Sequence, residues 1–204
     1  MVRKFGRVLG KAGKDFWAFA MSTQHWKYPH PTLATLRLQM FSDLAYGAQG
    51  LQFFTYWTPV NSEGFDYQFG PIGLDGKRTV AYDLVRQVNQ EIKALSGVFV
   101  GAKVLWVRHT GPKIPRGTIR LDKLPEPVHV LETEGTGAVI SLLENDGKQF
   151  LAIVNRDYEA PMRLIFSADA KVKRILKDGT IVPANAYTPV MTVDPGDIVI
   201  YMWE

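Results

Sequence analysis

The chain has 204 residues, of which 46% are hydrophobic and 22% are charged, and its formal net charge is +4. This composition is typical of a globular protein and argues against an intrinsically disordered chain or a membrane protein. The mild, scattered positive charge indicates no nucleic-acid partner. Cysteine is absent, which excludes disulfides and thiolate metal sites, and the four histidines have no metal-ligand spacing, so we expect no metal and no cofactor.

The N-terminal segment is basic but lacks the apolar core of about 7–15 residues that a signal peptide requires. No run approaches the ~20 apolar residues of a membrane span. We therefore expect neither an export signal nor a membrane segment in this chain, and its compartment stays unknown.

Residues 14–97 have the pattern of a parallel α/β sheet. Near-continuous apolar runs at Phe16–Met21 and Leu51–Phe54 predict two strands that are buried on both faces. Two parallel strands do not make a stable layer alone, because their edges expose unpaired backbone groups. We therefore expect that the chain is a fragment or that it recruits strands from a partner or a second copy. The alternative is that the segment before Phe16, or the long loop after Pro59, supplies the extra strands.

Two helices are predicted beside these strands. Pro31 and Thr32 are typical of a helix start, and apolar residues then recur at helical spacing as far as Ala48. Thr79 begins a second periodic segment that continues to Leu95.

A cluster of aromatic, amide and imidazole side chains follows the two strands. Ligands of parallel sheets bind beyond the carboxyl ends of the strands. Aromatic rings can stack on the faces of sugars while polar groups bond to hydroxyls. The alternative is that these are packed or solvated loop residues. We predict a saccharide site made of Gln24, His25, Trp26, Tyr56, Trp57 and Glu63.

From residue 98 onward, short β-rich runs alternate with turn signals such as Asn145-Asp146-Gly147 and Asp178-Gly179. Short strands at ~8–12-residue spacing favour an antiparallel β-sandwich. We therefore divide the chain into residues 1–97 and 98–204.

Six segments of the first region share a pattern with a known family: Phe16–Met21, Trp26, Arg37-Leu38-Gln39, Ala45–Gly50, Phe53–Trp57 and Asp75–Thr79. Together they resemble the closing part of a clan A glycoside hydrolase barrel, most like the family 42 β-galactosidases and related bacterial proteins. The resemblance implies an α/β plus all-β chain. Its first part would be a partial (β/α)8 barrel, namely the last two βα units, and an antiparallel β-sandwich would follow.

The catalytic pair of that family is not found here. Its nucleophile is a glutamate at the end of the seventh strand and its acid/base is a glutamate on the fourth, and retaining hydrolysis needs the two about 5–5.5 Å apart. The corresponding strand end reads Ala20-Met21-Ser22-Thr23, and no acidic residue occurs between Phe16 and Phe41. The catalytic residues are therefore unknown.

The resemblance implies a carbohydrate-active protein that is incomplete and inactive as this chain alone. The alternatives are a non-catalytic carbohydrate-binding or assembly module and a truncated reading frame. The expected partners are an oligosaccharide or polysaccharide, together with either a second copy of the chain or a missing N-terminal barrel half. The parent family suggests a periplasmic or secreted location.

Overall fold

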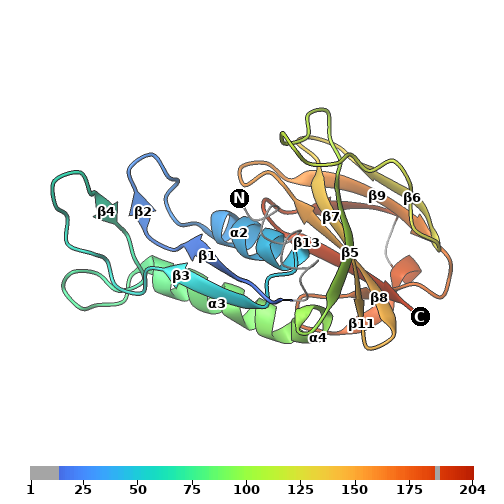
Figure 1. Ribbon diagram of the computed structural model, residues 1–204, viewed down its shortest axis with the longest axis horizontal. Helices are drawn as coiled ribbons and strands as arrows, with labels where there is room; N and C mark the ends of the chain where they lie inside the picture. The colour runs from blue at the N-terminus through green and yellow to red at the C-terminus, as the bar shows by residue number, and fades with distance from the viewer. Residues whose placement is uncertain (1–13, 187–188) are drawn as a thin grey trace.

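The computed structural model describes residues 14–186 and 189–204. It places the helices and several short strands at one end of the molecule and a β-sandwich at the other (Figure 1). The basic N-terminal segment, for which we predicted no export signal, lies almost entirely outside the described residues. Within the described ranges, no helix is long and apolar enough to cross a membrane.

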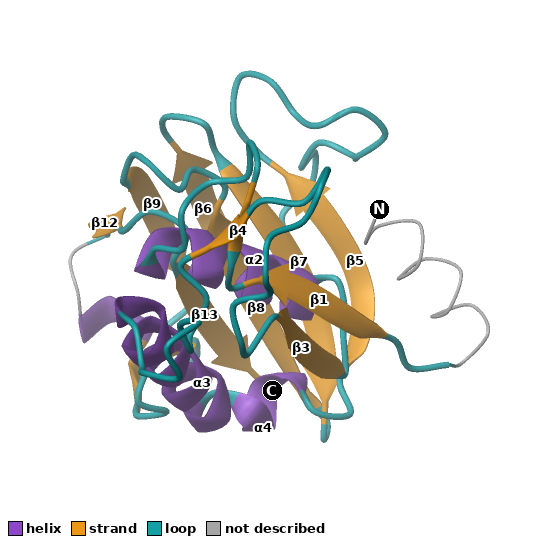
Figure 2. Cartoon of the chain, turned by 90° about the vertical axis from the view of Figure 1, so that its left-hand side faces the viewer, coloured by secondary structure: helices purple, strands orange, loops and turns teal. Residues whose placement is uncertain are grey.

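Strands β1 (Trp17–Met21) and β3 (Gly50–Phe54) form a parallel pair, with Trp17 opposite Gly50 and Met21 opposite Phe54. Helices α2 (Leu33–Ala45) and α3 (Val80–Ala94) cover one face of this pair (Figure 2). The expectation that both faces are buried is wrong, because Trp17 and Phe19 on the other face are each 67% exposed. The side chains buried under the covered face include Ala20, Leu36, Met40 and Val88.

The two helices begin where the sequence predicts. Thr32 is the N-cap of α2, and its hydroxyl accepts a hydrogen bond from the backbone of Thr35 at 3.1 Å. Thr79 is the N-cap of α3 and accepts from the backbone of Ala81 at 3.2 Å. Helix α2 ends at Ala45, just before Gly47, which has a φ of 92° that the helix cannot continue. A short helix, α4 (Ser96–Phe99), follows α3.

The rest of the chain forms two antiparallel sheets. The larger has the order β11-β10-β13-β8-β7-β5, and the smaller has the order β12-β9-β6. Their bounds are β5 (Lys103–His109), β6 (Val128–Thr133), β7 (Ala138–Asn145), β8 (Lys148–Asn155), β9 (Met162–Ala168), β10 (Lys173–Ile175), β11 (Ile181–Pro183), β12 (Val190–Val193) and β13 (Ile198–Trp203), with a 3-10 helix η1 (Ala184–Ala186) before β12.

The six-stranded sheet is covered on both faces. The smaller sheet packs on one face, where the rings of Phe166 and Tyr201 stack 3.6 Å apart. Helix α2 packs on the other face through Phe41 and Leu44, which lie in one cluster with residues of β7, β8 and β13. The strand β13 is therefore buried along its whole length. Through this contact, helix α2 joins the elements of residues 14–97 to the sandwich.

The predicted partial (β/α)8 barrel is wrong. Strand residues make up 38% of the structure and the three helices 18%, and in the described residues no sheet closes into a barrel. The only parallel strands there are β1 and β3, and the loop after β3 adds no strand to them. Instead, β4 (Tyr67–Gln68) in that loop pairs antiparallel with β2 (Gln24–His25) as a separate small sheet. The sequence of β1, α2 and β3 could be predicted from the apolar pattern, but this pattern does not indicate how many strands pair in the sheet.

The turn between β12 and β13 touches the first turn of α2 at Gly196. This glycine has a φ of 68°, and a Cβ built on it would overlap the carbonyl oxygen of Ala34. We expect Gly196→Ala to lower the free energy of unfolding by roughly 2–4 kcal/mol, since strain and a backbone clash add together. Gly147→Ala is the control, because Gly147 has a φ of 73° but nothing within 4 Å of its Cβ position. Equal losses for the two variants in urea unfolding would show that Gly196 makes no close contact with α2.

Candidate functional site

The segments that follow β1 and β3 are tied together at the end of the molecule opposite the sandwich (Figure 1). The Ser22 backbone N–H donates to the carbonyl of Phe54 at 2.9 Å, and its hydroxyl donates to the carbonyl of Thr55 at 2.9 Å. The Thr55 N–H in turn donates to the hydroxyl of Thr23 at 3.3 Å. The two segments predicted to carry the site therefore begin side by side.

Beyond these contacts, β2 and β4 pair so that Gln24 lies opposite Gln68 and His25 opposite Tyr67. The carbonyl of Asp66 accepts from the Trp26 N–H at 3.3 Å and lies 3.1 Å from Nδ1 of His25. The pairing joins residues about forty positions apart in the chain. It holds Gln24, His25 and Trp26 on the same small sheet as the loop after β3.

Four rings on this sheet form what we call the aromatic stack: Trp26, His25, Tyr67 and Phe65. The His25 ring lies 4.7 Å from Trp26 and 4.4 Å from Tyr67, with interplanar angles of 21° and 19°. Phe65 lies 6.1 Å from both His25 and Tyr67 and is nearly parallel to each. Offset stacking of this kind is a favourable arrangement of aromatic rings. Trp26 remains 59% exposed and Phe65 51% exposed, so the stack presents open ring surface to solvent.

Tyr56 and Trp57 form a second exposed pair on the segment after β3. They are 65% and 50% exposed, respectively. Their backbone is fixed by Ile72, whose N–H donates to the Tyr56 carbonyl at 3.0 Å and whose carbonyl accepts from the Thr58 N–H at 2.8 Å. In the described part of the chain, no ring contact joins Tyr56 or Trp57 to the aromatic stack. The structure therefore brings the predicted residues Gln24, His25 and Trp26 together on the small sheet, while Tyr56 and Trp57 form a separate group on the segment after β3.

Glu63 lies in a tight turn between Ser62 and Phe65, whose backbones bond to each other at 2.9 and 3.2 Å. Its side chain is exposed, two residues before the Phe65 ring of the stack. The nearby Asp66 carboxylate is already engaged, because it accepts from Asn61 at 3.2 Å and from Gln68 at 3.1 Å. No group of three or more acidic or histidine side chains suited to a metal ion occurs among the described residues.

Tyr67, Phe65 and Gln68 were not among the predicted site residues. The sequence did carry a signal for them, namely aromatic residues at alternate positions 65, 67 and 69 of a long loop. Alternation is the spacing that puts side chains on one face of an extended segment. Phe69 instead meets His30 edge to face at 4.4 Å, which extends the aromatic surface toward the loop before α2.

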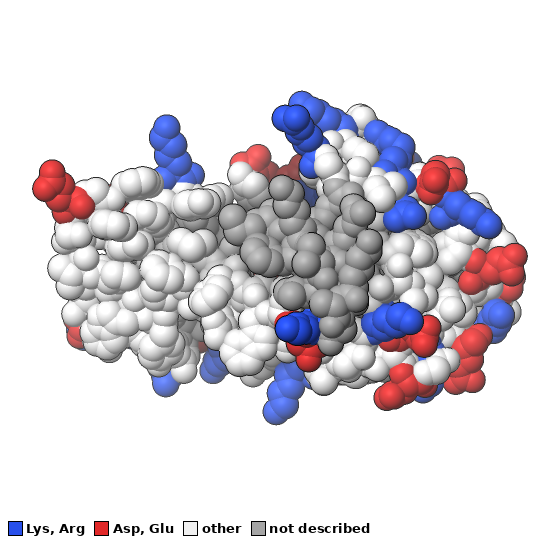
Figure 3. Space-filling model, viewed as in Figure 1, with Lys and Arg blue, Asp and Glu red and all other residues white. Residues whose placement is uncertain are grey.

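On the face that Figure 3 shows, charged side chains gather mainly over the sandwich. In Figure 3 most of the visible surface at the end with β2 and β4 is neither acidic nor basic. A surface of exposed rings and amides with few charges favours a neutral ligand over a phosphorylated or ionic one, and the exposed Lys27 and Glu63 lie beside it.

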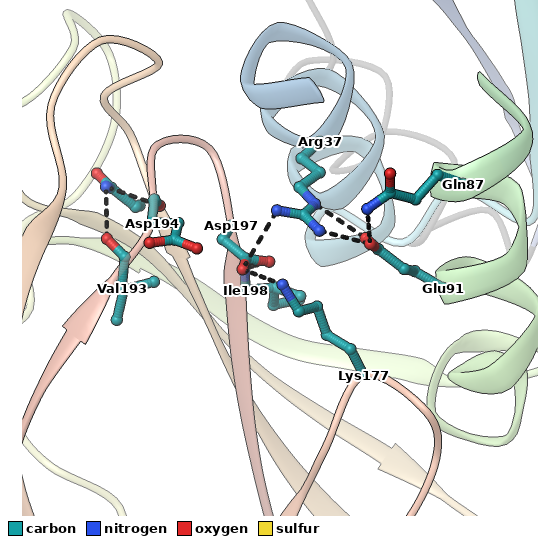
Figure 4. A network of polar contacts seen from close by, with 9 residues as sticks. Arg37, Gln87, Glu91, Lys177, Val193, Asp194, Asp197 and Ile198 are labelled. Atoms are coloured by element: carbon teal, nitrogen blue, oxygen red, sulfur yellow. Dashed lines mark hydrogen bonds and ion pairs between the residues drawn. The ribbon is translucent and has the colours of Figure 1, made fainter. Parts of the chain in front are cut away.

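A buried ionic network lies between the helices and the sandwich (Figure 4). Arg37 of α2 donates to both carboxylate oxygens of Glu91 in α3, at 2.9 and 2.5 Å, and lies 3.6 Å from Asp197. Lys177 approaches the same Asp197 oxygen at 2.5 Å. The charges of the network thus have partners within the chain, so we interpret it as a structural link and not as a ligand site.

A cavity of about 280 Å³ adjoins this network within the sandwich, beside β10 and the turn before β13. Lys177 and Asp197 line it, and they are already paired with each other. None of the predicted site residues lines it.

No protein-family model matches this chain, and no curated protein matches it. The resemblance to family 42 glycoside hydrolases therefore stays a prediction that rests on the sequence segments quoted above.

Proposed function

We propose that this chain binds a neutral oligosaccharide or polysaccharide at its aromatic end and does not hydrolyse it unaided. The observation that carries the proposal is the aromatic stack, in which rings from two distant loops are held nearly parallel and open to solvent. Such a surface offers flat apolar faces for the C–H faces of sugar rings.

Polar groups beside the rings supply the second requirement of a saccharide site. Gln24 lies opposite Gln68 on the β2–β4 pair, and amides can both donate to and accept from hydroxyls. Apolar surface with a few placed polar groups is the usual composition of a small-molecule site. Tyr56 and Trp57 extend the exposed aromatic surface toward the end of β3.

The absence of hydrolysis is inferred from the carboxylates at this end. Glycoside hydrolysis needs a pair of carboxyl groups, about 5–5.5 Å apart for retention or about 6.5–9.5 Å apart for inversion. Near the stack, Glu63 is exposed in a turn, while Asp66 is held by Asn61 and Gln68. Neither is placed as an oriented acid or nucleophile. We expect no turnover of nitrophenyl galactosides or glucosides, and turnover that a single carboxylate substitution abolishes would contradict this part of the proposal.

Binding is tested by titration calorimetry with neutral oligosaccharides built from galactose, glucose, mannose or xylose. We expect at least one series to bind, and Trp26→Ala to weaken its binding about tenfold or more, which corresponds to ~1.4 kcal/mol. The physical reason is the loss of the outer ring of the stack, which is 59% exposed in the free protein.

Tyr158→Ala is the matched control, because Tyr158 is an exposed aromatic residue of the sandwich, 40% exposed and remote from the stack. Its binding constant is expected to equal that of the unmodified chain. If none of the four series binds, or if both variants lose affinity equally, the aromatic end is not the saccharide site.

A further inference from the structure

Positive charge in the sandwich is concentrated in one segment. Residues 103–124 comprise β5 and most of the loop that follows it, and they contain six Lys or Arg residues and one acidic residue, Asp122. Residues 125–204 have the opposite balance, with seven basic and twelve acidic residues. In Figure 3 basic side chains gather at the top of the sandwich, where Figure 1 draws the loop after β5. We call residues 103–124 the basic segment.

Most cations of the basic segment are exposed and lack acidic partners. Arg108 is the exception, since its Nε lies 3.9 Å from the carboxylate of Asp122. In the described ranges, no carboxylate lies within 4.0 Å of the other five, which are all exposed: Lys103, Lys113, Arg116, Arg120 and Lys123. Unpaired like charges repel one another, so an anionic partner would stabilise this surface.

The loop that carries four of these cations is held against β5. It runs from residue 110 to residue 127, and loops longer than about 12–15 residues in a compact domain are usually functional or disordered. Its return leg bonds to the end of β5. The His109 N–H donates to the carbonyl of Ile119 at 2.9 Å, and the Leu121 N–H donates to the carbonyl of His109 at 2.8 Å. The loop is therefore fixed along the edge strand of the larger sheet.

Two guanidinium groups meet at the start of this loop. Arg120 donates to the carbonyls of Gly111 and Pro112, at 2.6 and 3.3 Å. Arg156, directly after β8, donates to the carbonyls of residues 110 and 113, which flank them, at 3.0 Å each. Burial lowers the pKa of the Arg156 guanidinium, and the positive charge of Arg120 lowers it further. The carboxylate of Asp157 accepts hydrogen bonds from three other residues, and no carboxylate of the described residues forms an ion pair with either arginine.

The other side chains of the basic segment limit the class of partner. Single-stranded nucleic acids stack their bases on exposed rings, whereas Trp106 is half-buried with the Arg108 guanidinium 5.6 Å from its ring centre. Membrane anchors and the cores of protein interfaces need a group of exposed apolar or aromatic side chains. Only Leu105 and Ile119 are exposed among the large apolar residues of this segment, at 38% and 47%. The surface therefore favours a polyanion that is recognised by its charge.

We propose that the basic segment binds an acidic polysaccharide, a polymer of sugars that carry carboxylate groups. Guanidinium and ammonium groups form charge-assisted hydrogen bonds with carboxylates, and arginine can do so through two parallel bonds. Such a polymer repeats its charge at every sugar and requires neither stacking rings nor an apolar surface. The basic segment lies on the sandwich, apart from the aromatic end and its neutral ligand, so this proposal does not rest on the proposed function.

Titration calorimetry with polygalacturonate tests the proposal, because every sugar of this polymer carries a carboxylate. We expect it to bind, to bind more weakly as NaCl rises from about 50 to about 500 mM, and not to bind once its carboxylates are methyl-esterified. The triple variant Lys113→Gln/Arg116→Gln/Lys123→Gln should weaken binding about tenfold or more, since it removes three exposed cations. Neutral oligosaccharides should bind this variant as they bind the unmodified chain.

The triple variant Lys93→Gln/Lys171→Gln/Lys173→Gln is the matched control, because it removes the same charge from exposed residues outside the basic segment. This control and Trp26→Ala should both bind polygalacturonate like the unmodified chain. The proposal is overturned by no binding, by equal binding of the methyl ester, or by equal losses in the two triple variants. A loss in Trp26→Ala alone would place the binding at the aromatic end. Tighter binding of single-stranded DNA or of phosphatidylserine vesicles than of polygalacturonate would contradict the class of partner.

Discussion

Arg37→Met is expected to lower the free energy of unfolding by about 3–5 kcal/mol, since removing one partner of a buried ion pair leaves a buried charge uncompensated. The Arg37 and Glu91 side chains are only 7% and 11% exposed. Arg37 also lies 3.6 Å from Asp197, so the loss affects α2, α3 and the sandwich together. Chemical unfolding followed by circular dichroism measures the effect.

A matched surface pair provides the control. Arg86 and Asp83 of α3 lie 3.4 Å apart but are 63% and 67% exposed, and such pairs contribute about 0–1 kcal/mol. Arg86→Met should therefore change stability little. The double variant Arg37→Met/Glu91→Met should be more stable than Arg37→Met alone, because it removes the stranded carboxylate. If Arg37→Met and Arg86→Met have equal effects, the network does not join the two parts of the molecule.

Asp43→Asn is expected to stabilise the protein at neutral and alkaline pH. Burial in α2, where Asp43 is 6% exposed, raises the pKa of its carboxyl from 3.8 to about 7. The folded state therefore holds this proton more tightly than the unfolded state. Ionisation costs stability progressively as pH rises from about 4 to about 7, and the cost is constant above that range.

The size of the effect follows from the same shift. About three pH units correspond to roughly 4 kcal/mol, an upper estimate because local opening and solvent entry reduce it. Unfolding free energies of the two proteins should converge near pH 4 and diverge toward pH 8, with Asp43→Asn the more stable. Asp83→Asn, an exposed acidic residue of α3, should show no such divergence. Parallel pH profiles for Asp43→Asn and the unmodified chain would mean that Asp43 is not buried as a carboxylic acid.

The sequence predicted local elements better than their assembly. The starts of both helices were recognisable, because Thr32 and Thr79 are capping residues that act within a few positions of the chain. The parallel strands were recognisable from their apolar runs, but the barrel inferred from them was wrong. Strand number depends on pairing between distant segments, which periodicity does not encode.

The candidate site shows the same division. Gln24, His25 and Trp26 could be identified because they directly follow a predicted strand. Their partners Phe65 and Tyr67 lie about forty residues further on, and only the β2–β4 pairing places them there. Gln39 is a further example, since nothing in the sequence indicates that a helix side chain meets the backbone of Met21 at a strand edge.

The most direct measurement of saccharide binding at the aromatic end uses the indole N–H signals of the five tryptophans in an ¹⁵N-labelled protein. We expect an oligosaccharide that binds to shift the signals of Trp26 and Trp57 and to leave those of Trp106 and Trp203 in the sandwich unchanged. Shifts confined to Trp106 or Trp203, or no shift at a saturating concentration of any neutral oligosaccharide, would contradict binding at this end.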